Sequence, residues 1–337
     1  MKQPSFSRGV MLFMIISLFV MGTLGEYLIV QAQRGSGAGG RNFQVLVSRN
    51  GKDNAGEVGV FEAGFKTRVG MVKVGNNEGI AIDKQGDLYQ CGDGAGGPSI
   101  KIFARFAERA KKDATFDPKY DREIKGAKTT LKNPKGLDLD TARGLIFVAE
   151  NGNGTVLVFS AEAAGEVEPI ATVTPPAKPW DVEYDDATDS LYVALVNGKV
   201  AVYDRFVFSG FDGTPERSIE PEGSVNLHGI VYDRAQDMLL LSDVGQATSN
   251  EDGKLFVVRQ ASKVYGVVKP ARTIEGVKTK LGNPVDIVYD GKDLYVAEKA
   301  NDVLLVYRNF ALGPSGAIVA DVIIDDIKPE ALLLLTQ

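Results

Sequence analysis

Residues 133–160 read NPKGLDLDTARGLIFVAENGNGTVLVFS, and residues 283–307 read NPVDIVYDGKDLYVAEKANDVLLVY. Both stretches begin with Asn-Pro, continue through an apolar segment that ends in Asp, and pass a polar turn into a second apolar segment. A third apolar segment follows another turn. Apolar residues that alternate over about four to eight positions between turn residues indicate β-strands with a buried face. Each stretch is therefore predicted to form three consecutive strands.

The same unit occurs five times at intervals of roughly 50 residues, which suits one four-stranded propeller blade per unit. A fourth strand is visible as PERSIE from Pro215 and as PARTIEG from Pro270. The five units start at Asn76, Asn133, Lys178, Asn226 and Asn283.

The two ends of the chain supply a sixth unit. NFQVLVS from Asn42 and EVGVFE from Glu57 match the second and third strands without a start, whereas KPEALLLL from Lys328 matches a start without a continuation. Pairing of these ends would close a ring and remove exposed sheet edges. We predict an all-β fold, a six-bladed β-propeller of four-stranded blades over residues 42–337, closed by pairing of the C-terminal strand with the N-terminal strands. An open solenoid is the alternative, but it would not need half a unit at each end.

Residues 1–32 are predicted to be a targeting segment. Lys2 and Arg8 precede a long uncharged apolar run, which is the pattern of a signal peptide, and cleavage after Ala32 is expected. An uncleaved membrane anchor is the alternative, because about 20 apolar residues can span a bilayer. The Gly-rich residues 33–41 are predicted to be a flexible spacer. We therefore expect an exported protein that is periplasmic, secreted or anchored to the outer face of the cytoplasmic membrane.

The composition excludes several classes of function. The formal net charge is -6 and the charged residues of both signs are mixed along the chain, so no basic stripe is available and we expect no nucleic-acid partner. Cys91 is the only cysteine, which excludes an intramolecular disulfide and a cysteine-based zinc site. His228 is the only histidine, which excludes mechanisms that need a histidine pair. We expect a monomer.

The repeated pattern resembles a known group of propellers. The motif N-P-x-G-apolar-x-x-D, a turn, LYVA, a turn and [KV]-x-V-[FY] is similar to the NHL-repeat propellers and to the related calcium-dependent lactonase and regucalcin-like propellers. The P-x-R-x-I-x-G fourth strand, with Arg217 in one unit and Arg272 in another, resembles the version found in exported bacterial proteins. The resemblance covers residues 42–334 and implies the fold more strongly than any activity, because one fold hosts many functions.

The third residue of each unit is predicted to project toward the central axis at one mouth of the channel, because the units share one register. The fourth residue is expected to pack into the strand itself. Two carboxylates, an ammonium group, an indole and an imidazole would make a polar ligand site there. Alternatively, the charged residues neutralise one another beside channel water, and the indole belongs to the core. In ring order the third-position residues are Glu78, Lys135, Trp180, His228, Val285 and Glu330.

The resemblance to the lactonase-like propellers implies calcium, held in those relatives by a Glu, Asn and Asp set at the channel mouth. Glu78 matches the family's carboxylate, because NEGIAID resembles its E-G motif, and it is the best metal candidate. Lys135 and Trp180 stand where amide or acid ligands are wanted, and an ammonium group cannot coordinate a cation. The zinc-dependent NHL lyases need several histidines, whereas this chain has His228 alone.

A second set of carboxylates follows the second strand of each unit. These side chains could bind a hard cation through oxygen ligands, or they could accept backbone N–H bonds in turns. The turn interpretation is favoured. The residues are Asp93, Glu150, Asp243 and Glu298.

Two functions follow from these observations. No nucleophile and base pair, metal cage or cofactor motif is evident, so the first hypothesis is a binding module that holds a protein, peptide or glycan at the channel mouth or rim. The alternative is a calcium-dependent hydrolase of the lactonase or regucalcin kind, with Glu78 and Glu330 at its centre.

Overall fold

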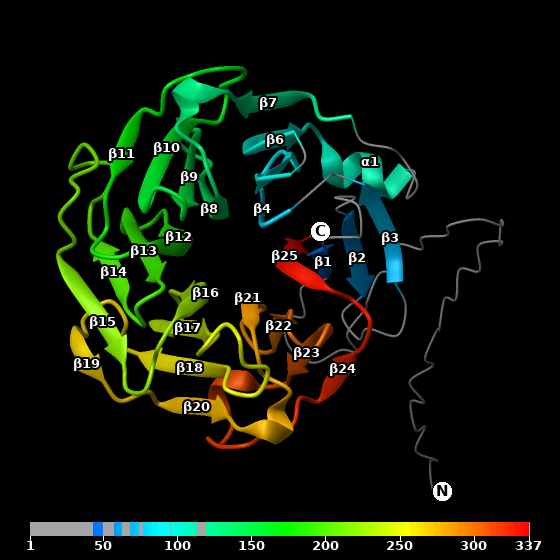
Figure 1. Ribbon diagram of the computed structural model, residues 1–337, viewed down its shortest axis with the longest axis vertical. Coiled ribbons are helices and arrows are strands. Elements are labelled where there is room, and N and C mark those ends of the chain that lie inside the picture. The colour runs from blue at the N-terminus through cyan, green and yellow to red at the C-terminus, as the bar shows by residue number, and fades with distance from the viewer. Residues whose placement is uncertain are drawn as a thin grey trace, which may run out of the picture.

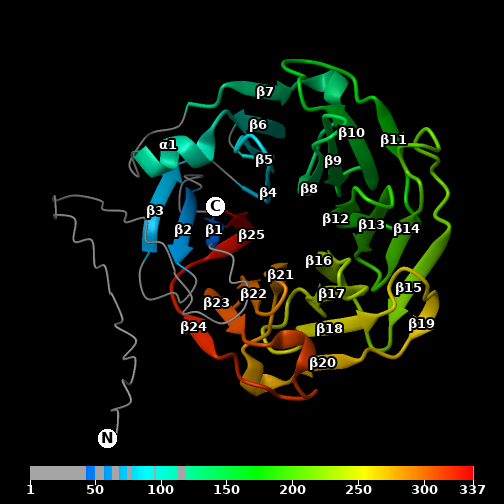
Figure 2. The same cartoon turned by 180° about the vertical axis from the view of Figure 1, so that it is seen from behind.

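The computed structural model describes residues 43–49, 57–62, 68–73, 77–94, 96–112 and 119–336. Within these ranges six β-sheets surround a central axis (Figure 1), and the view from behind shows the same ring (Figure 2). The chain is therefore an all-β propeller. The predicted targeting segment and spacer, residues 1–41, lie outside the described residues. In the described part, no helix has the length and apolar character needed to cross a membrane.

The first three sheets are built from consecutive strands. Sheet 1 contains β4 (Gly79–Ile82), β5 (Leu88–Gly92), β6 (Ser99–Phe103) and β7 (Arg122–Lys125). Sheet 2 contains β8 (Pro134–Asp140), β9 (Leu145–Glu150), β10 (Thr155–Ser160) and β11 (Ala171–Val173). Sheet 3 contains β12 (Pro179–Asp185), β13 (Ser190–Leu195), β14 (Val200–Tyr203), β15 (Arg217–Pro221) and β19 (Gly266–Val268).

The other three sheets complete the ring. Sheet 4 contains β16 (Leu227–Asp233), β17 (Met238–Asp243), β18 (Lys254–Arg259) and β20 (Arg272–Glu275). Sheet 5 contains β21 (Pro284–Tyr289), β22 (Leu294–Glu298), β23 (Val303–Tyr307) and β24 (Val322–Ile324). Sheet 6 contains β25 (Pro329–Thr336), β1 (Phe43–Arg49), β2 (Glu57–Glu62) and β3 (Arg68–Lys73). The described helical turns are α1 (Phe106–Lys112), η2 (Ala127–Thr129), η3 (Val277–Thr279) and η4 (Phe310–Leu312).

The prediction of six four-stranded blades is wrong for one sheet, because five sheets have four strands and sheet 3 has five. The extra strand β19 lies in the connection between β18 and β20 and pairs in parallel with β15 of the preceding sheet, where Ile219 is opposite Gly266. Two shorter contacts of the same kind are isolated bridges between Ile124 and Gly165 and between Ile274 and Gly316. The repeat pattern could not reveal β19, because this strand belongs by sequence to one unit and by pairing to another.

The predicted ring closure is confirmed by the pairing of β25 with β1. The two strands run antiparallel, with Val45 opposite Leu334 and Val47 opposite Leu332. The side chain of Ser48 also accepts the backbone N–H of Ala331 at 2.8 Å. The last strand therefore becomes the innermost strand of a sheet whose other members come from the start of the chain.

The core lies between neighbouring sheets. In β22, Leu294 and Val296 pack with residues of sheet 4, whereas Tyr295 and Ala297 pack with residues of sheet 6. Successive side chains of a strand point to opposite faces, so a strand between two sheets is buried on both faces and has a continuous apolar sequence. The inner strands are less completely buried because one edge faces the channel, and this edge is where polar residues of the repeat can gather.

Arginine residues of the fourth strands join neighbouring sheets. Arg217 donates to the carbonyl of Ala261 at 2.6 Å, and Arg272 donates to the carbonyl of Pro314 at 2.8 Å. Arg122 makes the same kind of contact with the turn after β10. Each guanidinium group thus satisfies carbonyl groups of the next sheet, which gives a structural reason for the repeated P-x-R-x-I pattern.

Candidate functional site

The site lies where the inner strands begin, at one mouth of the central channel. A cavity of about 130 Å³ is lined by residues of all six inner strands, including Glu78, Lys135, Trp180 and Val285 from the predicted third-position set. The strands reach the mouth in the same register, because each begins with the repeated Asn-Pro or related dipeptide.

Four of the predicted residues form one continuous run of contacts. Lys135 Nζ lies 2.9 Å from Glu78 Oε1, and the two side chains are only 12% and 14% exposed. The same ammonium group lies 5.1 Å from the ring centroid of Trp180, within the range of a cation–π interaction. The ring of Trp180 is stacked on that of His228, with 3.5 Å between the centroids and 10° between the planes. The structure therefore brings together residues from sheets 1, 2, 3 and 4.

Glu330 is not among the residues that line this cavity, and it pairs with a residue that the sequence analysis missed. Lys299, which follows β22 directly, places Nζ 2.7 Å from the Glu330 carboxylate. Burial lowers the pKa of His228 well below its usual value, and the positive charges of Lys135 and Lys299 lower it further. The two ammonium groups therefore both disfavour protonation of the same imidazole, which stays neutral. The position of Lys299 in the repeat could have identified it. In a hairpin the end of the second strand lies beside the start of the first strand, and Lys299 directly follows the second strand of its unit.

The imidazole of His228 has an unusual polar environment. The residue is 3% exposed, and Nδ1 has no hydrogen-bond partner among the described residues. A buried polar atom without a partner costs about 1–3 kcal/mol. Most native proteins satisfy such atoms, so this nitrogen is a feature that a ligand could explain.

Below the mouth, four half-buried carboxyl groups line the cavity. Burial raises the pKa of Asp138 to about 6 and that of Asp286 to about 7. Burial also raises the pKa of Asp181 and Glu183, and neighbouring carboxylates raise both further. These groups were not in the predicted site. All four are among the residues that line the cavity.

The channel carboxyl groups connect inner strands that belong to different sheets. Asp138 accepts the backbone N–H of Tyr184 from sheet 3 at 2.7 Å, and Asp286 accepts that of Leu332 from sheet 6 at 2.7 Å. The inner strands of different sheets do not pair through backbone hydrogen bonds. These carboxyl groups supply hydrogen bonds between them instead. The expectation that fourth-position residues pack into the strand is therefore wrong for Asp286.

Glycine at the fourth position allows this close approach. A Cβ atom at Gly136 would overlap the side chain of Asp181 from the next sheet. Glycine at this position leaves room for the neighbouring inner strand, whereas Asp286, at the same position of its own unit, supplies a bridging carboxyl group.

The second predicted set of carboxylates mainly closes turns. Glu150 accepts the backbone N–H groups of Lys132 and Asn133, at 2.8 Å and 2.9 Å. Asp243 and Glu298 accept backbone N–H groups in the same way, whereas Asp93 is exposed. In the part of the chain that the structure describes, no three His, Cys, Asp or Glu side chains are grouped to hold a metal ion. Glu78, the best metal candidate, is paired with an ammonium group instead.

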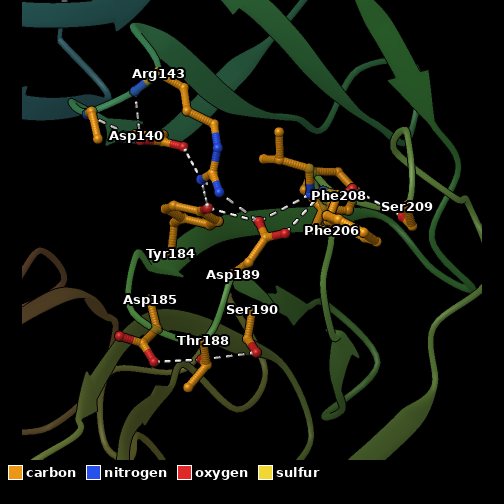
Figure 3. Close-up of polar contacts among 12 residues, drawn as sticks. Asp140, Arg143, Tyr184, Asp185, Thr188, Asp189, Ser190, Phe206, Phe208 and Ser209 are labelled. Atoms are coloured by element: carbon orange, nitrogen blue, oxygen red, sulfur yellow. Dashed lines mark hydrogen bonds and ion pairs between the residues drawn. The ribbon is translucent and has the colours of Figure 1, made fainter.

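A separate polar network lies at the other ends of the inner strands (Figure 3). Arg143 donates to Asp140 at 2.6 Å and to the hydroxyl of Tyr184 at 2.8 Å. That hydroxyl donates to Asp189, which also accepts the backbone N–H of Phe208. Burial raises the pKa of Tyr184, and the hydrogen bond to Asp189 raises it further. These groups satisfy one another, so the network stabilises the junction of sheets 2 and 3.

No protein-family model and no curated protein sequence matches the chain. The structure is similar to a periplasmic gluconolactonase from Pseudomonas aeruginosa, with 13% identity, a TM-score of 0.59 and coverage of 87% of this chain and 99% of that chain. It is also similar to a putative 6-phosphogluconolactonase from Bacteroides fragilis, with 12% identity, a TM-score of 0.58 and coverage of 87% and 98%. A chain of a nidogen/laminin complex shares 14% identity, with a TM-score of 0.60 and coverage of 87% and 98%. At these identities the similarity shows the fold alone.

Proposed function

We propose that the chain is a binding module that holds a protein, peptide or glycan ligand at the channel mouth. The observation that supports this function is the continuous run of contacts among Glu78, Lys135, Trp180 and His228, each from a different sheet. These contacts combine paired charges with aromatic rings, and ligand sites commonly place a few polar groups on an apolar frame. The ion pair of Lys299 with Glu330 adds a second pair of charges near His228.

The experiment uses the fluorescence of Trp180, the only tryptophan of the chain, as a reporter of the mouth. Peptide and glycan panels are titrated into the full-length protein and into the Lys135→Gln and Glu78→Gln variants. A ligand of the mouth should change the fluorescence and should bind at least about tenfold more weakly to one of these variants, equivalent to about 1.4 kcal/mol. Ligands whose affinity is unaffected by both substitutions would refute the assignment and favour mutual neutralisation of the channel charges.

The alternative function is a calcium-dependent hydrolase of the lactonase kind. It is supported by the resemblance of the repeat and by the structural similarity to a gluconolactonase and to a putative 6-phosphogluconolactonase. The ammonium group of Lys135 beside Glu78 opposes cation binding. Purified protein that carries stoichiometric calcium, and that loses lactone hydrolysis on chelation, would establish the hydrolase in place of the binding module.

We also propose that the module works outside the cytoplasm, because residues 1–32 have the charge and hydropathy pattern of an export segment. Fractionation of cells that produce the full chain tests this location. Recovery of the protein in the cytoplasm with an intact N-terminus would contradict it.

A further inference from the structure

Four carboxyl groups of the channel join the inner strands of neighbouring sheets. Asp138 joins sheet 2 to sheet 3, and Asp286 joins sheet 5 to sheet 6, each through a 2.7 Å hydrogen bond from a backbone N–H group. Asp181 and Glu183 of sheet 3 each accept a backbone N–H group of β16 in sheet 4. The inner strands are not neighbours in any one sheet, so these side chains are the polar links between them.

The same four groups lack a counter-ion. They line one cavity of about 130 Å³, and within the described part of the chain no lysine or arginine forms an ion pair with any of them. Lys135, which is the basic residue among the described lining residues, is paired with Glu78. The lining residues from β16 and β25 are apolar. Like charges that share a buried site disfavour one another, so the four groups cannot all ionise freely.

Carboxylates outside the cavity differ, because each has a cation. Asp140 lies 2.6 Å from Arg143, and Asp185 lies 3.1 Å from Arg234. The missing cation is thus a property of the channel set. The other charged or titratable groups that line the cavity or act on the four are Glu78, Cys91, Lys135, Asp140, Asp185 and Asp186.

We propose that Asp138, Asp181, Glu183 and Asp286 form a proton-dependent clasp, which holds the inner strands together while it retains its protons and lets them separate at the mouth when the protons are lost. The inference rests on the proposed function of the mouth as a binding site, because the clasp sets the shape of that site. It assigns to the channel a regulatory role that is separate from ligand contact.

Trp180 couples the clasp to the mouth. This residue directly precedes Asp181 in β12, and its ring lies between Lys135 of sheet 2 and His228 of sheet 4. The ammonium group is 5.1 Å from the ring centroid, and the imidazole is stacked at 3.5 Å. A displacement of β12 relative to β8 or β16 therefore changes at least one of these two contacts.

The pH range of the change follows from the ionisation of the four groups. Burial raises the pKa of Asp138 to about 6 and that of Asp286 to about 7. Burial also raises the pKa of Asp181, and the charge of Asp286 raises it further. At pH 5 the set is mostly protonated, whereas at pH 8 negative charges repel one another across the cavity. The clasp is therefore closed at pH 5 and weakened at pH 8.

The test needs no ligand, because Trp180 is the only tryptophan of the chain. Acrylamide, a neutral quencher, is titrated into the full-length protein at intervals from pH 5 to pH 8. Separation of the inner strands should raise the quenching constant of Trp180 at least about twofold over this range. Circular dichroism is recorded in parallel and should stay constant, because the sheets themselves remain folded.

The nuclear magnetic resonance signals of His228 give a second measurement. Stacking on Trp180 shifts the ring signals, and this shift should decrease as the pH rises. Burial and the charges of Lys135 and Lys299 hold the pKa of His228 well below its usual value, so its own protonation does not produce a change at neutral pH.

Two substitutions assign the effect to the clasp. Asp286→Asn should move the midpoint of the quenching change to lower pH by about one unit, because the charge that raises the pKa of Asp181 is removed. Asp138→Asn should move it in the same direction, since Asp138 raises the pKa of Glu183, and it decides if the first variant does not fold. Asp325→Asn is the matched control at an exposed position and should keep the original midpoint.

The clasp is overturned by quenching that is constant from pH 5 to pH 8, by a midpoint that both substitutions leave unchanged, or by a parallel loss of the circular dichroism signal. None of these results affects the proposed binding function, which is tested by ligand titration. Conversely, a midpoint that responds to the substitutions supports the clasp even where no peptide or glycan binds, and the proposed function alone then fails.

Discussion

Replacing Asp286 with asparagine should remove a large part of the pH dependence of the propeller's stability. Burial raises the pKa of Asp286 from 3.8 to about 7 in the folded chain. A carboxyl group with a raised pKa holds its proton in the folded state after the unfolded chain has lost it. Its stabilising contribution is therefore fully present below about pH 4, falls as the pH rises, and is lost by about pH 7.

The size of the effect follows from the shift. One pKa unit corresponds to about 1.4 kcal/mol, so the full shift of roughly 3 units is worth about 4 kcal/mol. Part of this stabilisation is already lost at pH 5, which leaves about 3 kcal/mol between pH 5 and pH 8. The charge of Asp286 also raises the pKa of Asp181, so an uncharged residue at position 286 should weaken the pH dependence of that group as well.

The assay is urea unfolding of the original protein and of the Asp286→Asn variant at pH 5 and pH 8, followed by circular dichroism. Asparagine retains only one acceptor oxygen for the N–H groups of Ile287 and Leu332, so the variant should be less stable at pH 5. Asparagine does not titrate, so the variant lacks the contribution of position 286 to the difference in stability between the two pH values, and this difference is the quantity of interest. Asp325→Asn, at an exposed position, is the control and should keep the original difference. An Asp286→Asn protein with the original pH dependence would refute the argument.

Three further experiments test the architecture. Deletion of residues 327–337 removes the closing strand and should lower the melting temperature by far more than the length of the segment suggests. The single substitution Leu332→Ala should lower the free energy of unfolding by about 2–5 kcal/mol. An unchanged melting temperature of the truncated chain would contradict ring closure. Arg272→Met leaves the carbonyl groups of Phe310 and Pro314 without their donor and should cost about 2–5 kcal/mol in urea unfolding, whereas Arg308→Met, at an exposed position, should be nearly neutral. A chain that begins at residue 41 should be soluble with an all-β circular dichroism spectrum, and insolubility would count against the boundary.

The sequence was sufficient to predict the ring and the order of the residues around its mouth. A period of two and a repeated start fix which end of each inner strand reaches the mouth, and neighbouring units place equivalent residues side by side. The contact of Glu78 with Lys135 and the stacking of Trp180 on His228 follow from this order. The ligand-binding role of these residues stays a prediction.

The sequence was not sufficient to predict the contacts that join different units. Lys299 belongs to the unit of Val285, yet its partner Glu330 belongs to the next one. The pairing of β19 with β15 likewise links two units that are separate in sequence. Such contacts depend on the distance and angle between neighbouring sheets, which a repeat pattern does not contain.

The carboxyl groups of the channel escaped prediction for a different reason, which is a break in strand alternation. The pairing of β12 with β13 shifts register between Pro179 and Asp181, and that of β21 with β22 shifts between Pro284 and Asp286. At such a bulge two residues face one on the partner strand, so neighbouring side chains no longer have to point to opposite faces. Trp180 and Asp181 can therefore both line the cavity, although strict alternation would have turned one of them away. The bulges that made the prediction wrong for these residues thus also place charged groups along the channel.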